Sequence, residues 1–302
     1  MQNDKNLNLT RIGIFFDGNY FLHVSNYYNY FHPRRSRLSV AGLSQFIRKQ
    51  VATEEGKPES LIQIVDAHFF RGRLYASEAS QKGKQLFYDR VFDDILMSEG
   101  VTTHYLPVKT VLGIKQEKGI DVWLALEAFE LAFYKHFDVL VLIAADGDYV
   151  PLLRKLNTLG TRVMILGWQF EYTNNEGQEM STGTSQDLFD EATYPLAMHE
   201  LVENGLKQND PLFNNLFVKS VGRREAVKPA KGIDQKTKKS TIQNLKKGYG
   251  FIKHSPQNLF FYYQSLVGTD FNDLREGDRV AFTIDKNDKG EPIAINVRLL
   301  ES

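Results

Sequence analysis

The sequence predicts an α/β fold followed by a small all-β unit, on two observations. In the first two-thirds of the 302-residue chain, short apolar strand candidates alternate with helix-like segments, which is typical of a parallel sheet covered on both faces. In the last quarter, short alternating stretches separated by turn residues indicate strands without helices. A content of 42% hydrophobic and 25% charged residues is usual for a globular protein of this kind.

The strand candidates of the first part are apolar runs, and most are followed by a segment with helical periodicity. Strands are expected in RIGIFF (11–16), LIQIVDAHFFRG (61–72), VTTHYLPV (101–108), DVLVLIAA (138–145) and TRVMILGW (161–168). Helices are expected in LSVAGLSQFIRKQVA (38–52), GKQLFYDRVFDDILMSEG (83–100), GIDVWLALEAFELAFYKHF (119–137) and YVPLLRKLNTLG (149–160), with a last helical region near YPLAMHELVENGL (194–206).

Composition excludes several classes of protein. The chain has no cysteine, which removes disulfides, cysteine-based zinc sites and thiol catalysis. Its start lacks the apolar core of a signal peptide, and its longest apolar run is too short to span a bilayer. We therefore expect a cytoplasmic protein with no membrane partner.

The formal net charge is +0, but it is unevenly distributed. Residues 222–247 hold nine basic and two acidic side chains and few apolar ones, which is typical of a linker. We predict one domain at 10–207, a basic linker at 208–237 and a second domain at 238–302. The segment 169–187 is predicted as a long polar loop, open to interpretation as a lid, a partner site or a disordered segment.

Acidic residues follow two of the predicted strands directly. Asp17 ends the first strand, and Asp146 and Asp148 follow the fourth. If these strands are neighbours, three carboxylates meet outside the carboxyl ends of the sheet, where ligands bind in such folds. Asp121, in the first turn of a helix, lies near the same rim. Helix capping, which favours Asp, is the alternative explanation for each acid taken singly.

Such a cluster is electrostatically unfavourable, because two like charges about 4 Å apart repel by roughly 4 kcal/mol at an effective dielectric of 20. Neighbouring carboxylates either retain protons or bind a cation, and an all-oxygen site suits Mg²⁺ or Mn²⁺. A divalent ion would activate water and neutralise charge on a phosphodiester. We predict as metal ligands Asp17, Asp121, Asp146 and Asp148, and as a catalytic residue Asn19, which can orient the water.

Three blocks of the sequence resemble the signature blocks of the NYN domain, in the LabA-like branch of the PIN-like nuclease superfamily. They are GIFFDGNY, KGIDVWLALEAFELA and DVLVLIAADGDYVPLLRKLNTLGTRVMILGW, in the family's order, within about residues 10–205. The resemblance implies a PIN-like Rossmannoid sheet, metal-dependent RNA cleavage and a site at the same four acids and Asn19. It also implies that Lys118 faces the substrate. The family's usual Ser-Gly before the paired acids is Ala144-Ala145 here.

Aromatic residues alternate along two of the C-terminal strand candidates. Tyr249 and Phe251 share one face of a strand, and Phe260 and Tyr262 share one face of the next. Exposed rings on a basic sheet can stack unpaired bases, at about 1–3 kcal/mol per base. The alternative is that these rings form the core of the small unit.

The intervening residues of the same strands fit the inward-facing set. Ile252 and Phe261 are the expected core residues, whereas Gly248 and Gly250 are expected to keep the aromatic surface open. If Ile252 and Phe261 form the core, the aromatic rings lie on the outer surface.

The C-terminal segments NLKKGYGFIKHSPQNLFFYYQSL and FNDLREGDRVAFTIDKNDKGEPIAINVRLL resemble a cold-shock domain, over about residues 238–300. The resemblance implies a five-stranded OB-type barrel that binds single strands. By position, the residues of its nucleic-acid face are Lys247, Tyr249, Phe251, Phe260 and Tyr262. The family's usual Trp is Ile242 here, and its usual His is Tyr262.

Together these features predict a metal-dependent ribonuclease in which the second domain captures single-stranded RNA. DNA stays open as a substrate, and so does assembly into a homo-oligomer. A first alternative is an RNA-binding regulator whose nuclease-like domain is inactive or a scaffold. A second is a phosphohydrolase with Asp17 as nucleophile, which is disfavoured because Asn19 stands where that chemistry needs an acid. The basic segment 71–84 is a further candidate for contacts with a phosphate backbone.

Overall fold

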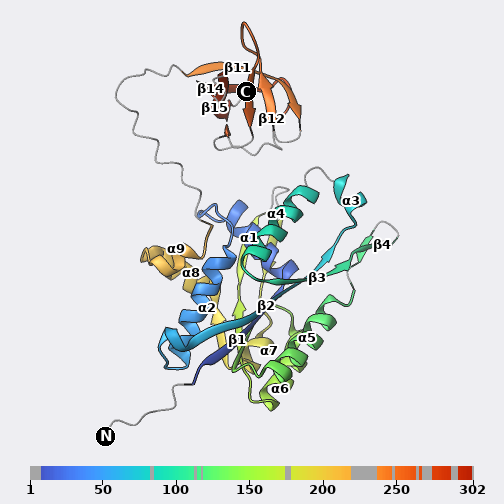
Figure 1. Cartoon of the computed structure of the whole chain (residues 1–302), viewed down its shortest axis with the longest axis vertical. Helices are drawn as coiled ribbons and strands as arrows, with labels where there is room; N and C mark the ends of the chain where they lie inside the picture. The colour runs from blue at the N-terminus through green and yellow to red at the C-terminus, as the bar shows by residue number, and fades with distance from the viewer. Residues whose placement is uncertain are drawn as a thin grey trace. The chain divides into compact units, whose positions relative to one another are not determined.

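The computed structural model of the chain forms two compact units, residues 1–222 and 223–302 (Figure 1). It describes residues 8–81, 85–111, 114–116, 118–173, 178–218, 237–246, 249–262, 265–266, 274–286 and 292–300. The first unit is α/β and the second is a closed β-barrel, which confirms the predicted fold class.

The first unit is built on a six-stranded sheet in the order β10-β7-β6-β1-β2-β3, and every neighbouring pair is parallel. Its strands are β1 (Thr10–Asp17), β2 (Ile62–Arg73), β3 (Thr102–Pro107), β6 (Val139–Ile143), β7 (Arg162–Gly167) and β10 (Tyr194–Ala197). β1 and β6, the first and fourth strands expected from the sequence, are neighbours. β2 and β3 therefore follow β1 on one side of the sheet, whereas β6, β7 and β10 follow on the other side.

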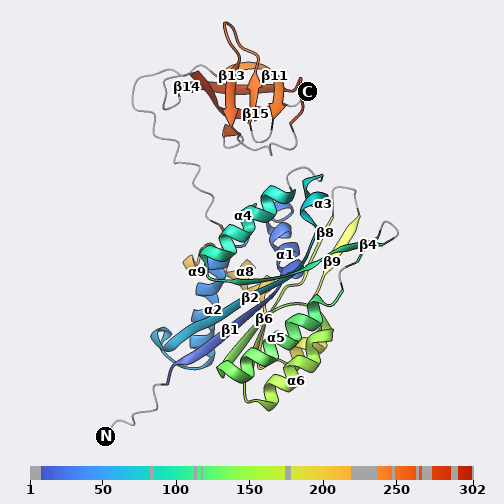
Figure 2. The same cartoon turned by 45° about the vertical axis from the view of Figure 1, so that its right-hand side comes forward.

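Helices cover both faces of this sheet and bury a separate core on each (Figure 2). One face carries α1 (Gly18–Tyr30), α2 (Val40–Glu54), α4 (Gln85–Ser98) and α8 (Met198–Lys207). The other face carries α5 (Ile120–Lys135), α6 (Val150–Thr158) and α7 (Gln186–Glu191). Every residue of β6 is fully buried, which explains why this strand reads as an unbroken apolar run.

Several elements differ from the sequence-based expectation. The segment 169–187 is not a continuous loop, because β8 (Phe170–Thr173) and β9 (Glu179–Thr182) pair as an antiparallel hairpin before α7. β10 is an edge strand within the region expected to be helical, and an edge strand tolerates Pro195. The remaining short elements are α3 (Ala76–Ser80), η1 (Glu59–Leu61), η2 (Gly147–Tyr149) and the hairpin of β4 (Lys109–Val111) and β5 (Ile114–Gln116).

The helix α9 (Pro211–Asn215) lies inside the span predicted as a linker but packs against α2 and α8. Gly42 of α2 makes this contact possible, because a Cβ there would lie 1.8 Å from the carbonyl oxygen of Asn215. A backbone approach this close admits only glycine.

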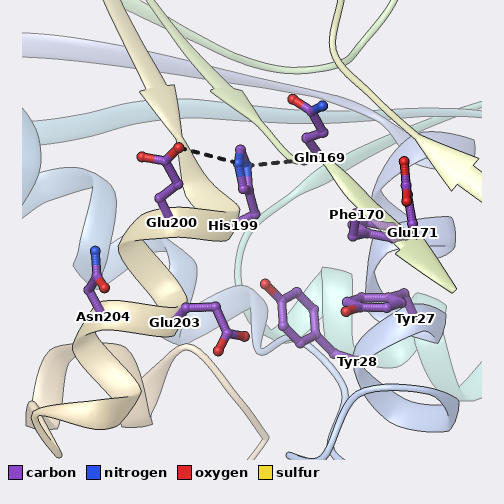
Figure 3. Close-up of a pocket in the computed structure, with 9 residues that line it drawn as sticks. All are labelled: Tyr27, Tyr28, Gln169, Phe170, Glu171, His199, Glu200, Glu203 and Asn204. Atoms are coloured by element: carbon purple, nitrogen blue, oxygen red, sulfur yellow. Dashed lines mark hydrogen bonds and ion pairs between the residues drawn. The ribbon is translucent and has the colours of Figure 1, made fainter.

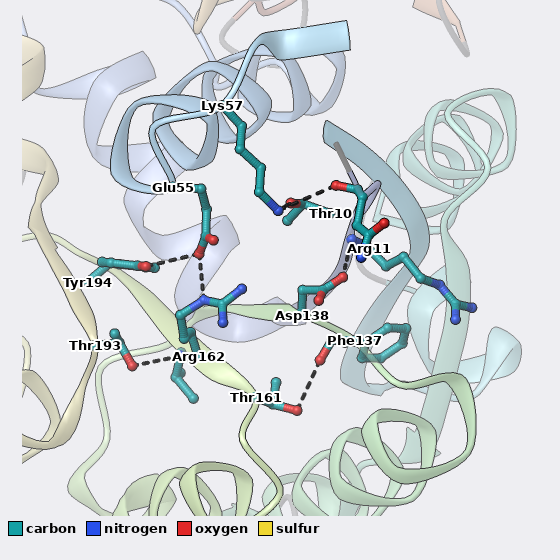
Figure 4. Close-up of polar contacts among 12 residues, drawn as sticks. Thr10, Arg11, Glu55, Lys57, Phe137, Asp138, Thr161, Arg162, Thr193 and Tyr194 are labelled. Carbon is teal, nitrogen blue, oxygen red and sulfur yellow. Dashed lines mark hydrogen bonds and ion pairs between the residues drawn. The ribbon is translucent and has the colours of Figure 1, made fainter. Parts of the chain in front are cut away.

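At the amino ends of the strands, charged and polar groups are paired with one another (Figure 4). Arg162 Nε donates to Glu55 Oε1 at 2.5 Å, and the Tyr194 hydroxyl donates to the same oxygen at 2.9 Å. The backbone N–H of Arg11 donates to Asp138 Oδ2 at 2.8 Å. This edge of the sheet is therefore closed by satisfied hydrogen bonds between distant segments.

The second unit is a closed barrel in the order β11-β12-β13-β15-β14. Its strands are β11 (Lys238–Lys246), β12 (Tyr249–Ile252), β13 (Leu259–Tyr262), β14 (Arg279–Lys286) and β15 (Pro292–Leu299). Part of β11 lies in the stretch whose composition indicated a linker, because most of its side chains are polar and at least partly exposed, and Ile242 alone among its residues is fully buried. Ile252 and Phe261 have no exposed surface, which confirms them as core residues.

Candidate functional site

Asp17 and Asp146 lie beside the point where the order of strands reverses. β1 and β6 are adjacent and parallel, with Phe16 paired to Ile143. Asp17 is the last residue of β1, and Asp146 follows the end of β6 by three residues. This is the position at which parallel α/β sheets form their ligand crevice.

Asp17 is the N-cap of α1. Its Oδ1 accepts hydrogen bonds from the backbone N–H groups of Asn19 and Tyr20, each at 3.1 Å. Capping thus accounts for an Asp at this position and fixes the carboxylate at the start of the helix. Asn19 is exposed in the first turn beside it.

Asp146 is also a cap, at the start of η2. Its Oδ1 accepts from the backbone N–H of Asp148 at 3.0 Å, and both acidic residues are exposed. Capping does not account for Asp148, which lies in the first turn of η2.

The buried hydroxyl of Tyr149 connects the acids that come from different elements. It donates a hydrogen bond to Asp121 Oδ1 at 3.0 Å. Burial raises the pKa of this hydroxyl, and the negative charges of Asp17, Asp121 and Asp146 raise the same pKa further. Carboxylates from the end of β1, the start of α5 and the loop after β6 therefore all act on one atom.

Tyr149 was missed in the sequence, where it reads as the first residue of an apolar helical run. The signal that could have revealed it is its place directly after two acids. A tyrosine that is 1% exposed needs an acceptor for its hydroxyl proton, and the nearest acids are obvious candidates.

The turn before α7 supports the loop that carries Asp146 and Asp148. The backbone N–H of Ser185 donates to the carbonyl oxygen of Ala145 at 2.8 Å. The Ser185 hydroxyl lies 2.9 Å from the point that a Cβ on Gly147 would occupy. The preceding Thr184 hydroxyl contacts the Tyr20 hydroxyl at 3.2 Å, so the same turn also holds the first turn of α1.

No Lys or Arg forms an ion pair with Asp121, Asp146 or Asp148 in the described part of the chain. Within those same residues, no group of three or more His, Asp or Glu side chains could hold a metal ion. The donors at this edge are all oxygens, which is the chemistry that Mg²⁺ and Mn²⁺ prefer. The four-acid ligand set therefore stays a prediction.

Lys118 is exposed immediately before α5, and Gly119 separates it from the helix. Gly119 adopts a left-handed conformation at φ 87°, which glycine reaches without strain. This turn sets the start of α5 and so the position of Asp121, one residue inside the helix.

The basic segment 71–84 was expected to contact a phosphate backbone, but two of its arginines form ion pairs within the first unit instead. Arg71 and Arg73 lie in strand β2 and form ion pairs across to α4, with Asp89 at 3.2 Å and Asp93 at 2.8 Å. Their charges are balanced within the first unit, and residues 82–84 lie outside the described part.

Four aromatic side chains form one continuous cluster on the surface of the barrel. Tyr249 is paired with Tyr262 across β12 and β13, and Phe251 with Phe260. The ring centroids are 5.4 Å apart for Tyr249 and Phe260, and 4.6 Å apart for Phe260 and Tyr262. Tyr262 is 54% exposed and the other three rings are partly exposed, as expected for an outer surface.

One other expectation for the barrel is corrected. Gly250 does not open the aromatic surface: it faces the core, where a Cβ would lie 2.7 Å from the Phe261 ring. Ile242, at the position of the usual Trp, is 1% exposed and belongs to the core. Lys247 and Gly248 lie outside the described residues.

A family model of the NYN domain matches residues 11–186, which is more than half of the chain. The chain belongs to the NYN family. The NYN domain is part of a nuclease superfamily, and here it contains the acidic residues at the switch between β1 and β6. A second family model, the 'Cold-shock' DNA-binding domain, matches residues 239–300. The predicted fusion of the two domains is confirmed, and it indicates a protein that binds nucleic acid.

The cold-shock domain is similar to small proteins of bacteria. The cold shock-like protein CspA of Vibrio cholerae is 40% identical over 53 residues, which are 17% of this chain and 76% of that protein. The major cold shock protein CspA of Pseudomonas aeruginosa is 42% identical over 48 residues, 16% of this chain and 70% of that protein.

One solved structure is similar to part of the chain. A crystal structure of a protein of unknown function from Vibrio parahaemolyticus shares 22% identity with this chain, at a TM-score of 0.39. The similarity covers 66% of this chain and 96% of that one.

A cavity of about 430 Å³ lies in the NYN domain between α1, β8 and α8 (Figure 3). Its lining includes the acidic Glu171, Glu200 and Glu203 and the rings of Tyr27 and Tyr28. None of the predicted site residues lines it, so this cavity is separate from the acids at the carboxyl ends of the strands.

Among the described helices of the NYN domain, none is long and apolar enough to cross a membrane, and the described part of the cold-shock domain contains none either.

Proposed function

We propose that this protein is a divalent-metal-dependent ribonuclease in which the NYN domain cleaves single-stranded RNA and the cold-shock domain holds it. The observation that carries the proposal is the hydrogen bond from the Tyr149 hydroxyl to Asp121, at a hydroxyl whose pKa is also raised by the negative charges of Asp17 and Asp146. Acids from three separate elements are thus near enough to affect one buried group, and a bound cation would relieve the repulsion between them.

The residues that would hold Mg²⁺ or Mn²⁺ are Asp17, Asp121, Asp146 and Asp148. Since the described residues include no three-acid group, one or two of these carboxylates would bind directly, and water and an RNA phosphate would complete the shell, as is usual for Mg²⁺. The ion, when bound, supplies an activated water and neutralises charge on the phosphodiester.

The chain's own groups would fix these donors in place. The Tyr149 hydroxyl orients the Asp121 carboxylate, and the backbone N–H groups of α1 and η2 orient those of Asp17 and Asp146. Asn19, exposed beside Asp17, would orient a water molecule through its amide.

On the barrel, we assign RNA bases to the cluster of Tyr249, Phe251, Phe260 and Tyr262, because partly exposed rings on a sheet stack unpaired bases. Lys247 and Lys118 would contact phosphates. A tether between binding and cleaving domains raises the local substrate concentration to the order of millimolar when its reach matches the span.

The test is cleavage of an end-labelled unstructured RNA in the presence of Mn²⁺ and in EDTA. Wild type is expected to cleave only with Mn²⁺, and Asp146→Asn is expected to lose about 100-fold in rate. Glu59→Gln, which removes an exposed acid in η1 away from the site, is the matched control and should cleave normally. Equal product from wild type and Asp146→Asn would refute the assignment.

The barrel is tested separately with Phe260→Ala, which should raise the apparent KM about tenfold while kcat changes little, because one stacking partner is lost. Leu299→Ala on β15 is the control for an exposed apolar residue outside the aromatic cluster. An unchanged KM in Phe260→Ala would remove this surface from RNA binding.

An RNA-binding regulator is the second candidate. It is favoured by the lack of a three-acid group in the described residues and by Ala144-Ala145 in place of the family's usual Ser-Gly. Binding of RNA by the full chain with no Mn²⁺-dependent product would select this function over cleavage.

A further inference from the structure

The helix α4 carries a row of large apolar side chains on its outer side. Phe87, Val91 and Ile95 are 51%, 39% and 41% exposed, and Tyr88 lies beside them with its ring 5.6 Å from that of Phe87. The spacing of four residues places the three on one line about 12 Å long. We call these three residues the α4 row.

The inner side of α4 combines the apolar contacts of Phe92 and Leu96 with buried polar contacts. Asp89, which is 7% exposed, accepts hydrogen bonds from Arg71 and Gln85. Asp93 accepts from the Tyr105 hydroxyl at 2.6 Å and pairs with Arg73 at 2.8 Å. A surface helix normally turns its apolar stripe inward.

The polar inner contacts and the apolar outer row together indicate that α4 has a further partner on its outer side. Leu96 is the only apolar residue of α4 that is fully buried within the described structure. Most helices are stabilised by burial of an apolar face, so covering the α4 row would add to the burial that Phe92 and Leu96 already supply.

We propose that the α4 row is the interface of a homodimer, formed by two α4 helices packed antiparallel about a twofold axis at Val91. In this arrangement Phe87 of each copy lies opposite Ile95 of the other, and Val91 lies opposite its own equivalent. The row is symmetric about its centre, which is the self-complementarity that a twofold interface requires.

The charges beside the row complement one another in the same arrangement. Arg90 and Asp94 form an exposed pair at 3.3 Å on one flank of α4, with 67% and 57% of their side chains exposed. A twofold axis places equal flanks of the two helices together, so Arg90 of each copy lies within reach of Asp94 of the other. Opposite charges therefore meet twice, and the Asp94 side chains offset the approach of the two Arg90 side chains near the axis.

The outer side of α5 is a less suitable interface for a second copy. It also exposes apolar side chains, including Val122 and Leu126. Its flank carries Glu127 and Glu130, which the same twofold arrangement would bring together. Two acids facing each other would oppose association.

The test is the mass of the full-length protein by sedimentation equilibrium, from about 1 to 100 µM. Wild type is expected to be a dimer at the upper end of this range. Val91→Glu should be a monomer throughout, with its dissociation constant raised about 100-fold or more, because two carboxylates would meet on the axis. Val122→Glu on α5 is the matched control and should associate as wild type does. Unchanged melting curves would show that each variant folds.

A charge exchange separates this interface from any other apolar contact. Arg90→Asp and Asp94→Arg should each weaken the dimer about tenfold, and the double variant should restore it, because the pairs reform with reversed sign. A wild-type monomer at every concentration, a Val91→Glu dimer as tight as wild type, or a double variant weaker than both single ones would overturn the proposal.

Discussion

Acidic residues at the two ends of the central strands differ in their partners. We call the side of the sheet where the strands begin the amino edge, and the side where they end the carboxyl edge. At the amino edge, the side chain of Glu55 is nearly buried, forms an ion pair with Arg162 and accepts a hydrogen bond from the Tyr194 hydroxyl (Figure 4). At the carboxyl edge, Asp121 and Asp146 receive only a tyrosine hydroxyl or a backbone N–H, with no cation paired to them in the described structure.

This difference separates acids that stabilise the fold from acids that are available to a ligand. A charge that is paired and hydrogen-bonded contributes to stability, whereas neighbouring acids without a cation repel one another and favour cation binding. Local arrangements that are unfavourable for the fold are expected at functional sites. Under the proposed function, a metal ion and RNA bind at the carboxyl edge, whereas substitutions at the amino edge should affect stability.

The sharpest test replaces one acid by its amide at each edge. Asp121→Asn is expected to lower the rate of RNA cleavage about 100-fold or more, because a charged donor to the ion is lost while its shape is kept. Asp138→Asn at the amino edge should cleave within about twofold of wild type, because an amide oxygen can still accept from Arg11. Comparable losses in both variants would show that the effect comes from the fold.

Metal binding should stabilise the protein through the carboxyl edge only. At about 100 times its dissociation constant, Mn²⁺ should raise the free energy of unfolding by about 2.7 kcal/mol. Thermal unfolding with Mn²⁺ and with EDTA measures this difference. Glu55→Gln should keep the full increment and Asp121→Asn should lose most of it; the reverse pattern would place the ion elsewhere.

The amino edge is tested by stability rather than by activity. Glu55→Gln should lower the free energy of unfolding by about 1–2 kcal/mol, because Arg162 loses its charged partner at a site that is largely shielded from water. Urea denaturation gives this value, and the rate of cleavage per folded molecule should not change. A large loss of cleavage at full stability would contradict the division between the edges.

The smallest expected effect is that of Tyr149→Phe. The variant keeps the buried ring and removes the hydrogen bond to Asp121, so cleavage should fall about fivefold, equivalent to about 1 kcal/mol. Steady-state kinetics at saturating RNA measure it. A loss as large as that of Asp121→Asn would mean that the hydroxyl does more than orient the carboxylate.

Much of the sheet could be predicted because strands buried on both faces appear in the sequence as short apolar runs. β6 is buried on both faces and reads as an unbroken apolar run. β10 was missed because its four residues include Pro195 and lead directly into α8, and only pairing with β7 makes them a strand. α1 was missed because its buried face is made of tyrosine, serine and glycine as well as apolar residues.

The site was predicted in part, for a topological reason. Asp17 and Asp146 could be brought together from the sequence because parallel strands end at one edge. The role of Tyr149 could not, since a tyrosine in an apolar run is indistinguishable from core until its hydroxyl has an acceptor. The ion pairs of Arg71 and Arg73 were equally hidden, because their partners lie on a helix whose rotation the sequence does not define.

The strand order also has a consequence for synthesis on the ribosome. β1 is made first, but its neighbour β6 ends at Ile143, 126 residues after Asp17. At about 5–20 residues per second, the interval between them is about 6–25 s. During this interval, the side of β1 that pairs with β6 in the folded protein has no partner strand. An unpaired strand of this kind can associate with other nascent chains. Asp17 and Asp146 are thus brought to neighbouring strand ends only late in translation, and chains released before β6 would lack this arrangement.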